Sequence, residues 1–257
     1  MTSLVPLLTL GVGLAFQAPP TIQTNSDGFR TPSNQVTPPN PALTPELRGD
    51  IMMARKMFRE AIDFYKPDAE KNAILANKTG IAYHQLQDLN NAEKYYRKAV
   101  KLKPDYPEAI NNLGTVYYAK KSYRRAINQY KNALRVSPNS ASVLSNLGTA
   151  YYARKQVEQA MEAYVQAFAI DPNIFEQHNS QGVLVQERTV EERAGYYYLL
   201  AKTCAKAGMT DRTLQYIRKA LENGFKEREK FKAEKEFSSL QDNMEFQLIL
   251  AAEYKVL

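Results

Sequence analysis

The sequence predicts an all-α fold of stacked helical hairpins, and three observations support this prediction. The chain matches itself at a shift of 34 residues. Within one unit, Ile110, Leu113, Gly114 and Tyr117 fall at i, i+3, i+4 and i+7, which places them on one face of a helix. A proline closes each unit and limits how far the second helix can run. The positions in register are Gly80, Gly114 and Gly148; Tyr83, Tyr117 and Tyr151; Ala92, Ala126 and Ala160; Tyr96, Tyr130 and Tyr164; Ala99, Ala133 and Ala167; and Pro104, Pro138 and Pro172.

The residues of each unit follow the pattern of a known repeat. Leu-Gly-x2-Tyr occurs at residues 113–117 and 147–151, with Thr79 in place of the leucine in the first unit. Ala-x3-Tyr and a proline follow, and the pattern resembles the tetratricopeptide repeat family, whose unit has Ala-x3-Phe at that point. The family's early Trp is absent, and its positions hold Ala76, Ile110 and Leu144. The resemblance implies a right-handed α-solenoid of stacked helix-turn-helix hairpins with capping helices.

The N-terminal residues predict an export signal followed by a linker. Leu4–Phe16 is apolar but too short for the roughly 20 residues that span a bilayer, which suits a secretory signal. A disordered or interfacial tail, or a wrongly assigned start, is the alternative. Seven of the 13 prolines lie in residues 19–45, a composition typical of a disordered tether. We therefore expect an exported, periplasmic or envelope-associated protein, with a cytoplasmic one as the alternative.

The remaining elements follow from the same register. Thr44-Pro45-Glu46 predicts a helix start, and Ala54, Phe58 and Ala61 repeat the second-helix pattern without a first helix before it. A decayed fourth unit begins after an insertion that is either a functional loop or a packed connection. The expected organisation is a signal peptide or apolar segment at 1–18, a linker at 19–45, an N-terminal half-repeat helix at 46–72, full repeats at 73–106, 107–140 and 141–174, an insertion loop at 175–193, a degenerate repeat at 194–227 and capping helices at 228–257.

No set of residues suited to catalysis stands out. His84 and His178 lack a second ligand at metal spacing, and the single cysteine, Cys204, excludes an internal disulfide and is expected in the core. Lys78-Thr79-Gly80 imitates a motif of penicillin-binding enzymes, but Ser-x-x-Lys is absent. We therefore expect no enzyme, no cofactor and no metal site.

A protein-binding groove is the main functional prediction, because solenoids expose a surface lined by the first helix of each unit. The stripe beside the inward face comprises Lys78, His84, Gln85, Asn112, Thr115, Tyr118, Asn146, Thr149 and Tyr152. The resemblance implies that asparagines at the places of Asn112 and Asn146 bind the backbone of an extended peptide. The alternative is that the asparagines bond within the solenoid and the tyrosines pack on its surface. Ser142 and Asn146 stand where a clamp for chaperone tails needs basic residues, which disfavours that partner.

A basic ridge at the inter-helix turns is the competing prediction. The net charge is +7, and six basic residues would align if the turns stack. Such a ridge would bind anions or nucleic acid in a salt-dependent manner, but aromatic residues are not interleaved for base stacking, so nucleic acid is the weaker expectation. The ridge consists of Lys120, Lys121, Arg124, Arg125, Arg154 and Lys155.

Overall fold

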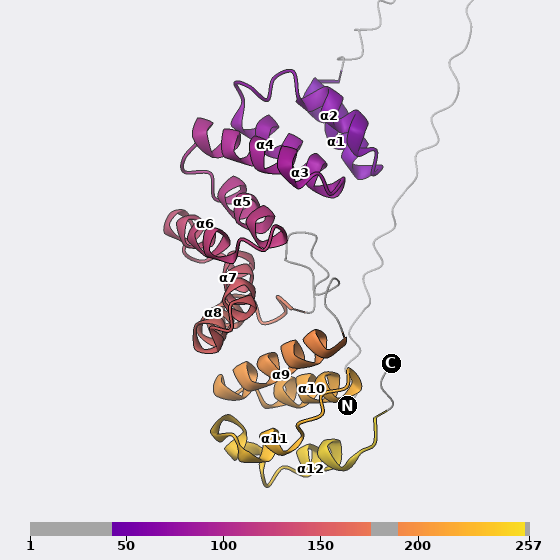
Figure 1. Ribbon diagram of the computed structural model, residues 1–257, viewed down its shortest axis with the longest axis vertical. Helices are drawn as coiled ribbons and strands as arrows, with labels where there is room; N and C mark the ends of the chain where they lie inside the picture. The colour runs from indigo at the N-terminus through magenta and orange to yellow at the C-terminus, as the bar shows by residue number, and fades with distance from the viewer. Residues whose placement is uncertain (1–42, 176–189, 255–257) are drawn as a thin grey trace, which may run out of the picture. The chain divides into compact units, whose positions relative to one another are not determined.

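The computed structural model describes residues 43–175 and 190–254, and every regular element within these ranges is a helix (Figure 1). This confirms the all-α class. The elements are α1 (Pro45–Ala54), α2 (Phe58–Tyr65), α3 (Ala73–Gln85), α4 (Leu89–Leu102), α5 (Pro107–Ala119), α6 (Tyr123–Val136), α7 (Ala141–Ala153), α8 (Val157–Ile170), α9 (Val190–Lys206), α10 (Thr210–Glu222), α11 (Glu229–Ala233), the 3-10 helix η2 (Lys235–Leu240) and α12 (Met244–Ala251).

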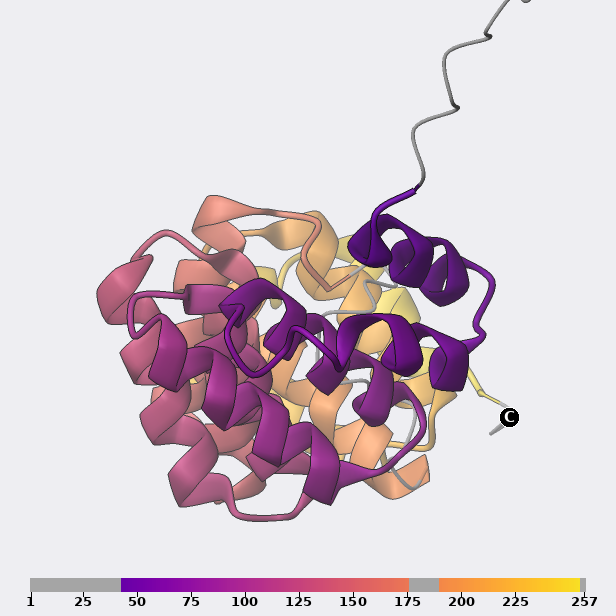
Figure 2. The ribbon, with the colours of Figure 1, turned by 90° about the horizontal axis from the view of Figure 1, so that it is seen from above.

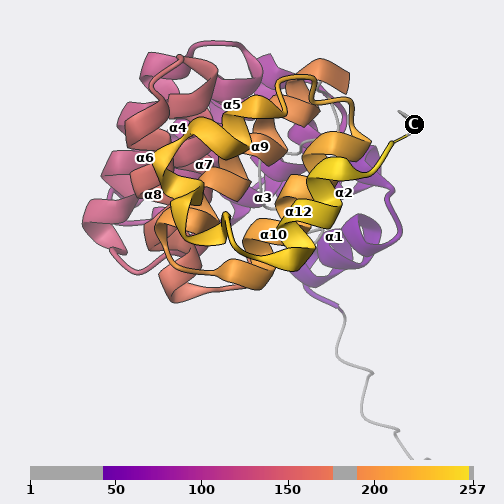
Figure 3. The ribbon, with the colours of Figure 1, turned by 90° about the horizontal axis from the view of Figure 1, so that it is seen from below.

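The helices pair in chain order into five hairpins, from α1/α2 to α9/α10, and the second helix of each hairpin also packs on the first helix of the next. The 3-10 helix η2 packs on α9, and α12 packs on α10. Figure 3 shows α12 beside α10. Within the described ranges no helix is long and apolar enough to cross a membrane. The expected signal segment, the linker up to Ala42 and residues 176–189 of the insertion lie outside the described residues.

Helix starts follow local chemistry. The Leu47 N–H donates to Thr44 Oγ1 at 3.2 Å and Pro45 occupies the first turn of α1, so the expected start at this point is confirmed. Asn72 Oδ1 accepts from the Ile74 N–H at 2.8 Å at the start of α3. These caps satisfy backbone donors that have no partner inside the helix.

A glycine–tyrosine contact closes each full hairpin. A Cβ added to Gly114 would lie 2.6 Å from Cε1 of Tyr130, and the glycines of the neighbouring units meet Tyr96 and Tyr164 in the same way. Each of these rings is almost fully buried. The conserved register of glycine and tyrosine within the chain thus marks the point where the two helices approach most closely.

The first hairpin differs from the single half-repeat helix expected over 46–72. α1 precedes α2 and packs against it, and Figure 2 shows the two as separate helices. Gly49 meets the Tyr65 ring as Gly80 meets Tyr96, and both pairs are 16 residues apart. Gly49 precedes Gly80 by 31 residues, so this is a whole unit shortened by three residues and not a half unit displaced by four.

In the fourth unit an alanine and an isoleucine replace the glycine and the tyrosine. Ala201 and Ile217 take the two positions, again 16 residues apart, and both are fully buried. The added methyl group of alanine is accommodated because isoleucine is smaller than tyrosine. Cys204 is buried in the same cluster, which confirms its expected place in the core, and Phe231, Phe237 and others from the C-terminal helices cover it.

Candidate functional site

The first helices of successive hairpins line a cavity of about 970 Å³, which we call the first-helix groove. Six of the nine predicted stripe residues line it: His84, Gln85, Asn112, Thr115, Tyr118 and Tyr152. Side chains outside the predicted stripe also line the groove, notably Asn77, Tyr106 and Asn111. Asn77 and Asn111 are 34 residues apart, so the self-match of the chain contained the signal for them.

Asparagine amides link the first helices of neighbouring hairpins. Asn112 Nδ2 donates to Asn77 Oδ1 at 3.0 Å, and Asn146 Nδ2 donates to Asn111 Oδ1 at the same distance. We call these two steps the asparagine ladder. Asn77 Nδ2 in turn reaches the Tyr106 hydroxyl at 3.4 Å. The alternative that the asparagines bond within the solenoid therefore holds for both ladder steps.

Burial corrects two of the stripe predictions. Asn146 and Thr149 are only 1% and 3% exposed, so almost none of either side chain is open at the groove surface. Thr149 Oγ1 lies 3.0 Å from both the Ser145 carbonyl oxygen and the Tyr164 hydroxyl. Asn146 therefore links the third unit to the second, and Thr149 bonds within the third unit, as expected for buried polar groups.

Lys78 is a third correction, since it is occupied by the first hairpin. Its Nζ lies 2.7 Å from Glu46 Oε1 and 2.7 Å from Asp50 Oδ2. The Tyr65 hydroxyl also donates to Asp50, at 2.6 Å. Partial burial raises the pKa of Asp50, but the Lys78 and Tyr65 hydrogen bonds outweigh it and hold the pKa below its ordinary value. Lys78 stands at the position of Asn112 and Asn146 in its own unit. It likewise donates a hydrogen bond to the preceding hairpin, where Glu46 is the acceptor.

Two tyrosines of the stripe are half-buried at the groove. The Tyr118 ring packs against Tyr123 with centroids 5.3 Å apart, and the Tyr152 ring packs against Tyr196 at 6.2 Å. Both leave part of an amphipathic ring at the groove surface, which is the type of side chain enriched in protein interfaces.

The six residues of the predicted basic ridge do not share one environment. Lys120 Nζ pairs with Glu93 Oε2 at 2.7 Å, and the Arg125 guanidinium lies over the Tyr117 ring at 5.8 Å. Lys121 and Lys155 line the first-helix groove instead. Arg124 is exposed and Arg154 half-buried, and neither lines the groove, so the six residues fall into three groups.

Comparison with known proteins identifies the repeat. A family model described as "TPR repeat" matches residues 80–121 and 114–154, and one described as "Tetratricopeptide repeat" matches residues 141–174. Residues 80–174 of this chain are tetratricopeptide repeats (TPR).

Solved TPR structures are similar in fold. A crystal structure of MamA is 23% identical over 68% of this chain and 93% of its own, with a TM-score of 0.50. A second MamA structure is 24% identical over 73% and 92% of the two chains, also with a TM-score of 0.50. YrrB, described as a TPR protein with an unusual peptide-binding site, is 16% identical over 68% and 82%, with a TM-score of 0.47. No curated protein matches the chain.

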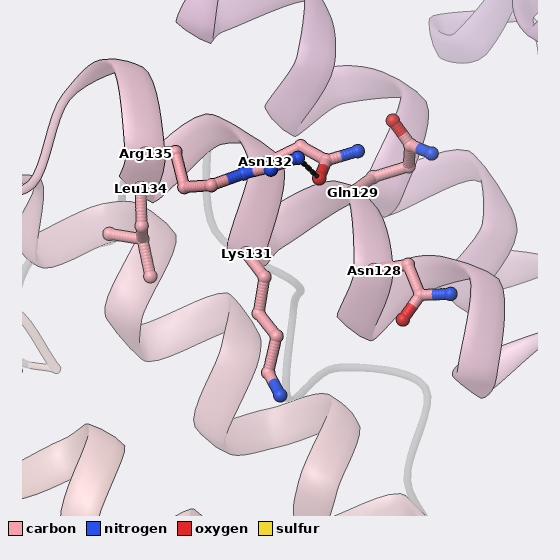
Figure 4. Close-up of a pocket in the computed structure, with 6 residues that line it drawn as sticks. All are labelled: Asn128, Gln129, Lys131, Asn132, Leu134 and Arg135. Atoms are coloured by element: carbon pink, nitrogen blue, oxygen red, sulfur yellow. Dashed lines mark hydrogen bonds between the residues drawn. The ribbon is translucent and has the colours of Figure 1, made fainter.

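A second hollow of about 730 Å³ lies on the outer side of one TPR helix, α6 (Figure 4). Its lining residues are Asn128, Gln129, Lys131, Asn132, Leu134 and Arg135, and Arg135 donates to Asn132. Because one helix supplies them all, they form a polar surface and not a site assembled from several elements. In the described part of this TPR protein no three His, Cys, Asp or Glu side chains gather at a distance suited to a metal ion, and His178 lies outside it.

Proposed function

We propose that this TPR protein is a non-catalytic interaction scaffold that binds an extended segment of a partner protein in the first-helix groove. The observation that carries the proposal is the groove itself, which successive first helices line with amides and tyrosine rings. Extended peptides offer alternating N–H and C=O groups, and amide side chains match both.

The asparagine ladder supports this proposal because it leaves defined groups unused. Asn112 commits its Nδ2 to Asn77, and no donor among the described residues reaches its Oδ1. Asn111 commits its Oδ1 to Asn146, and its Nδ2 has no acceptor in the same set. One acceptor and one donor on adjacent residues of α5 therefore remain for a peptide backbone, held in place by the other half of each amide.

Photo-crosslinking tests the groove directly. A photoreactive phenylalanine analogue at Tyr118 should crosslink peptides selected from a random linear library on the full chain. The same analogue at Asn128, on the outer side of α6, should not. Affinity should fall in the Asn112→Ala and Tyr118→Ala variants and stay unchanged in Asn128→Ala. Equal crosslinking from both positions, or equal affinity of all variants, would overturn the proposal.

The proposed place of action is the cell envelope. The apolar stretch Leu4–Phe16 and the proline-rich residues 19–45 support export followed by a tether. Fractionation of cells that make the full chain, with mass spectrometry of its N-terminus, tests this. A cleaved or membrane-associated pool is the expected result, and a wholly cytosolic pool with intact Met1 would contradict it.

A further inference from the structure

The turn between the two helices of each hairpin contains one residue in the left-handed backbone region. The φ angles are 60° at Lys56, 60° at Gln87, 57° at Lys121, 62° at Lys155 and 71° at Gly208. Each of the first four follows the C-cap of a first helix, where glycine is preferred. A residue with a Cβ is disfavoured there by roughly 1–2 kcal/mol. Three of the five turns nevertheless hold lysine.

Two of these lysines belong to the first-helix groove. Lys121 and Lys155 line it, together with Gln87, whereas Lys56 does not. Both are exposed, and no carboxylate of the described residues lies within ion-pair distance of either. The adjacent Lys120 is different, since Glu93 neutralises it. The groove thus has two ammonium groups without an ion-pair partner among the described residues, and both come from the same turn position of consecutive units.

The charges of the groove are divided between the two ends of the first helices. Lys121 follows the C-terminal end of α5, and His84 lies in the last turn of α3. The groove also has two carboxylates, Glu108 in the first turn of α5 and Glu192 at the start of α9, and the N-terminal end of α7 is uncharged. A lysine near a helix C-terminus also gains from the helix dipole, but that gain applies equally to Lys56 outside the groove. The helix dipole therefore does not explain why both turns at the groove hold a lysine.

We propose that the segment bound in the first-helix groove is acidic, with Asp or Glu side chains that pair with Lys121 and Lys155. This inference rests on the proposed function, because it assigns the chemistry of the peptide in the same groove. Charge complementarity of this kind selects partners and speeds their association.

Glycine substitution offers a test that removes the charge without disturbing the fold. Gly adopts a positive φ freely, so the Lys121→Gly/Lys155→Gly variant should unfold at the same or a higher urea concentration than the wild type. Lys56→Gly is the matched control, because it has the same backbone conformation but lies outside the groove lining. Lys121→Gln/Lys155→Gln also removes both charges but keeps a long side chain at each position. It is the second variant, for the case that glycine makes the turns too flexible.

The probes are fluorescein-labelled peptides taken from the selected library, each made with glutamates and with glutamines at the same positions. The glutamate forms should bind more tightly to the wild type, and the double variants should weaken them by roughly tenfold, as the loss of two exposed ion pairs predicts. Rising ionic strength should reduce the difference. Lys56→Gly should bind as the wild type does.

The outcomes separate this inference from the proposed function. If both forms bind equally and only Asn112→Ala and Tyr118→Ala weaken them, the groove binds peptides but the acidic partner is wrong. If no peptide crosslinks at Tyr118, the proposed function fails first. Tighter binding of a single-stranded oligonucleotide than of any peptide, lost in the double variants, would also overturn the inference and favour nucleic acid.

Discussion

Replacing Gly114 by alanine tests how the hairpins are closed. The new Cβ would lie 2.6 Å and 2.8 Å from Cε1 and Cδ1 of Tyr130, whereas carbon atoms prefer a separation of about 3.5–4.0 Å. The ring would have to move by about 1 Å, and it is fully buried. Overpacking of this kind costs about 1–3 kcal/mol, and the better helix propensity of alanine returns about 1 kcal/mol. We expect a net loss of roughly 1–2 kcal/mol in the free energy of unfolding.

The fourth unit supplies the compensating change, because it already combines Ala201 with Ile217. Tyr130→Ile alone should cost roughly 2–4 kcal/mol through the lost contacts and the cavity. Gly114→Ala/Tyr130→Ile should be less destabilised than the sum of the single variants by about 1 kcal/mol or more, since the smaller side chain makes room for the methyl group.

Urea unfolding followed by circular dichroism measures these differences, with Gly195→Ala as the matched control. Gly195 also lies inside a helix, but the nearest atom to its added Cβ is the Tyr152 hydroxyl oxygen, at the far end of a side chain. This control should be neutral or stabilised by up to about 1 kcal/mol. A Gly114→Ala variant as stable as Gly195→Ala, or strictly additive double-variant energies, would refute the close-approach explanation.

Three further predictions concern the interior and the first hairpin. Lys78→Ala should destabilise that hairpin by about 1 kcal/mol, seen as faster amide exchange in α1 and α2 alone; exchange that rises equally in all hairpins would contradict it. Because the pKa of Asp50 is lowered in the folded chain, its contribution is present above the ordinary value of 3.8 and is lost as the pH falls further, and Lys78→Ala should remove most of this acid sensitivity. Asn146→Ala should cost about 1–3 kcal/mol in urea unfolding because it leaves a buried acceptor unpaired, and more than Asn112→Ala at its half-exposed step; equal costs would argue against burial as the cause. Cys204→Ser should lower the unfolding midpoint by placing a hydroxyl in an apolar cluster, and an unchanged midpoint would show that the hydroxyl finds a partner there.

The repeat register made most of the fold predictable. Glycine and tyrosine recur because close helix approach requires a small residue opposite a ring, and this requirement is visible in the letters of the sequence. The same rule contained the missed first unit, since Gly49 and Tyr65 have the spacing of Gly80 and Tyr96. A fixed shift of 34 does not align this pair with the others, because the first unit is three residues shorter.

The groove was predictable as a surface but not residue by residue. Helical spacing places Asn112 and Asn146 on one stripe, yet one is half-exposed and the other buried. Their difference arises from how each hairpin packs on the next, which periodicity within one unit does not describe. Lys78 shows the same limit, since its acceptors lie in a hairpin that the fixed register did not detect.

The asparagine ladder also determines the order in which the units can follow one another. Unit 107–140 contains both a donor, Asn112, and an acceptor, Asn111. A second copy of this unit could therefore form the same hydrogen bond with the first copy. Unit 73–106 has Lys78 at the donor position, where it pairs with Glu46 and Asp50 of the first hairpin, and unit 141–174 has Ser145 at the acceptor position. Tandem duplication of the middle unit would repeat the same asparagine–asparagine hydrogen bond at the new step, which would lengthen the groove by whole repeats.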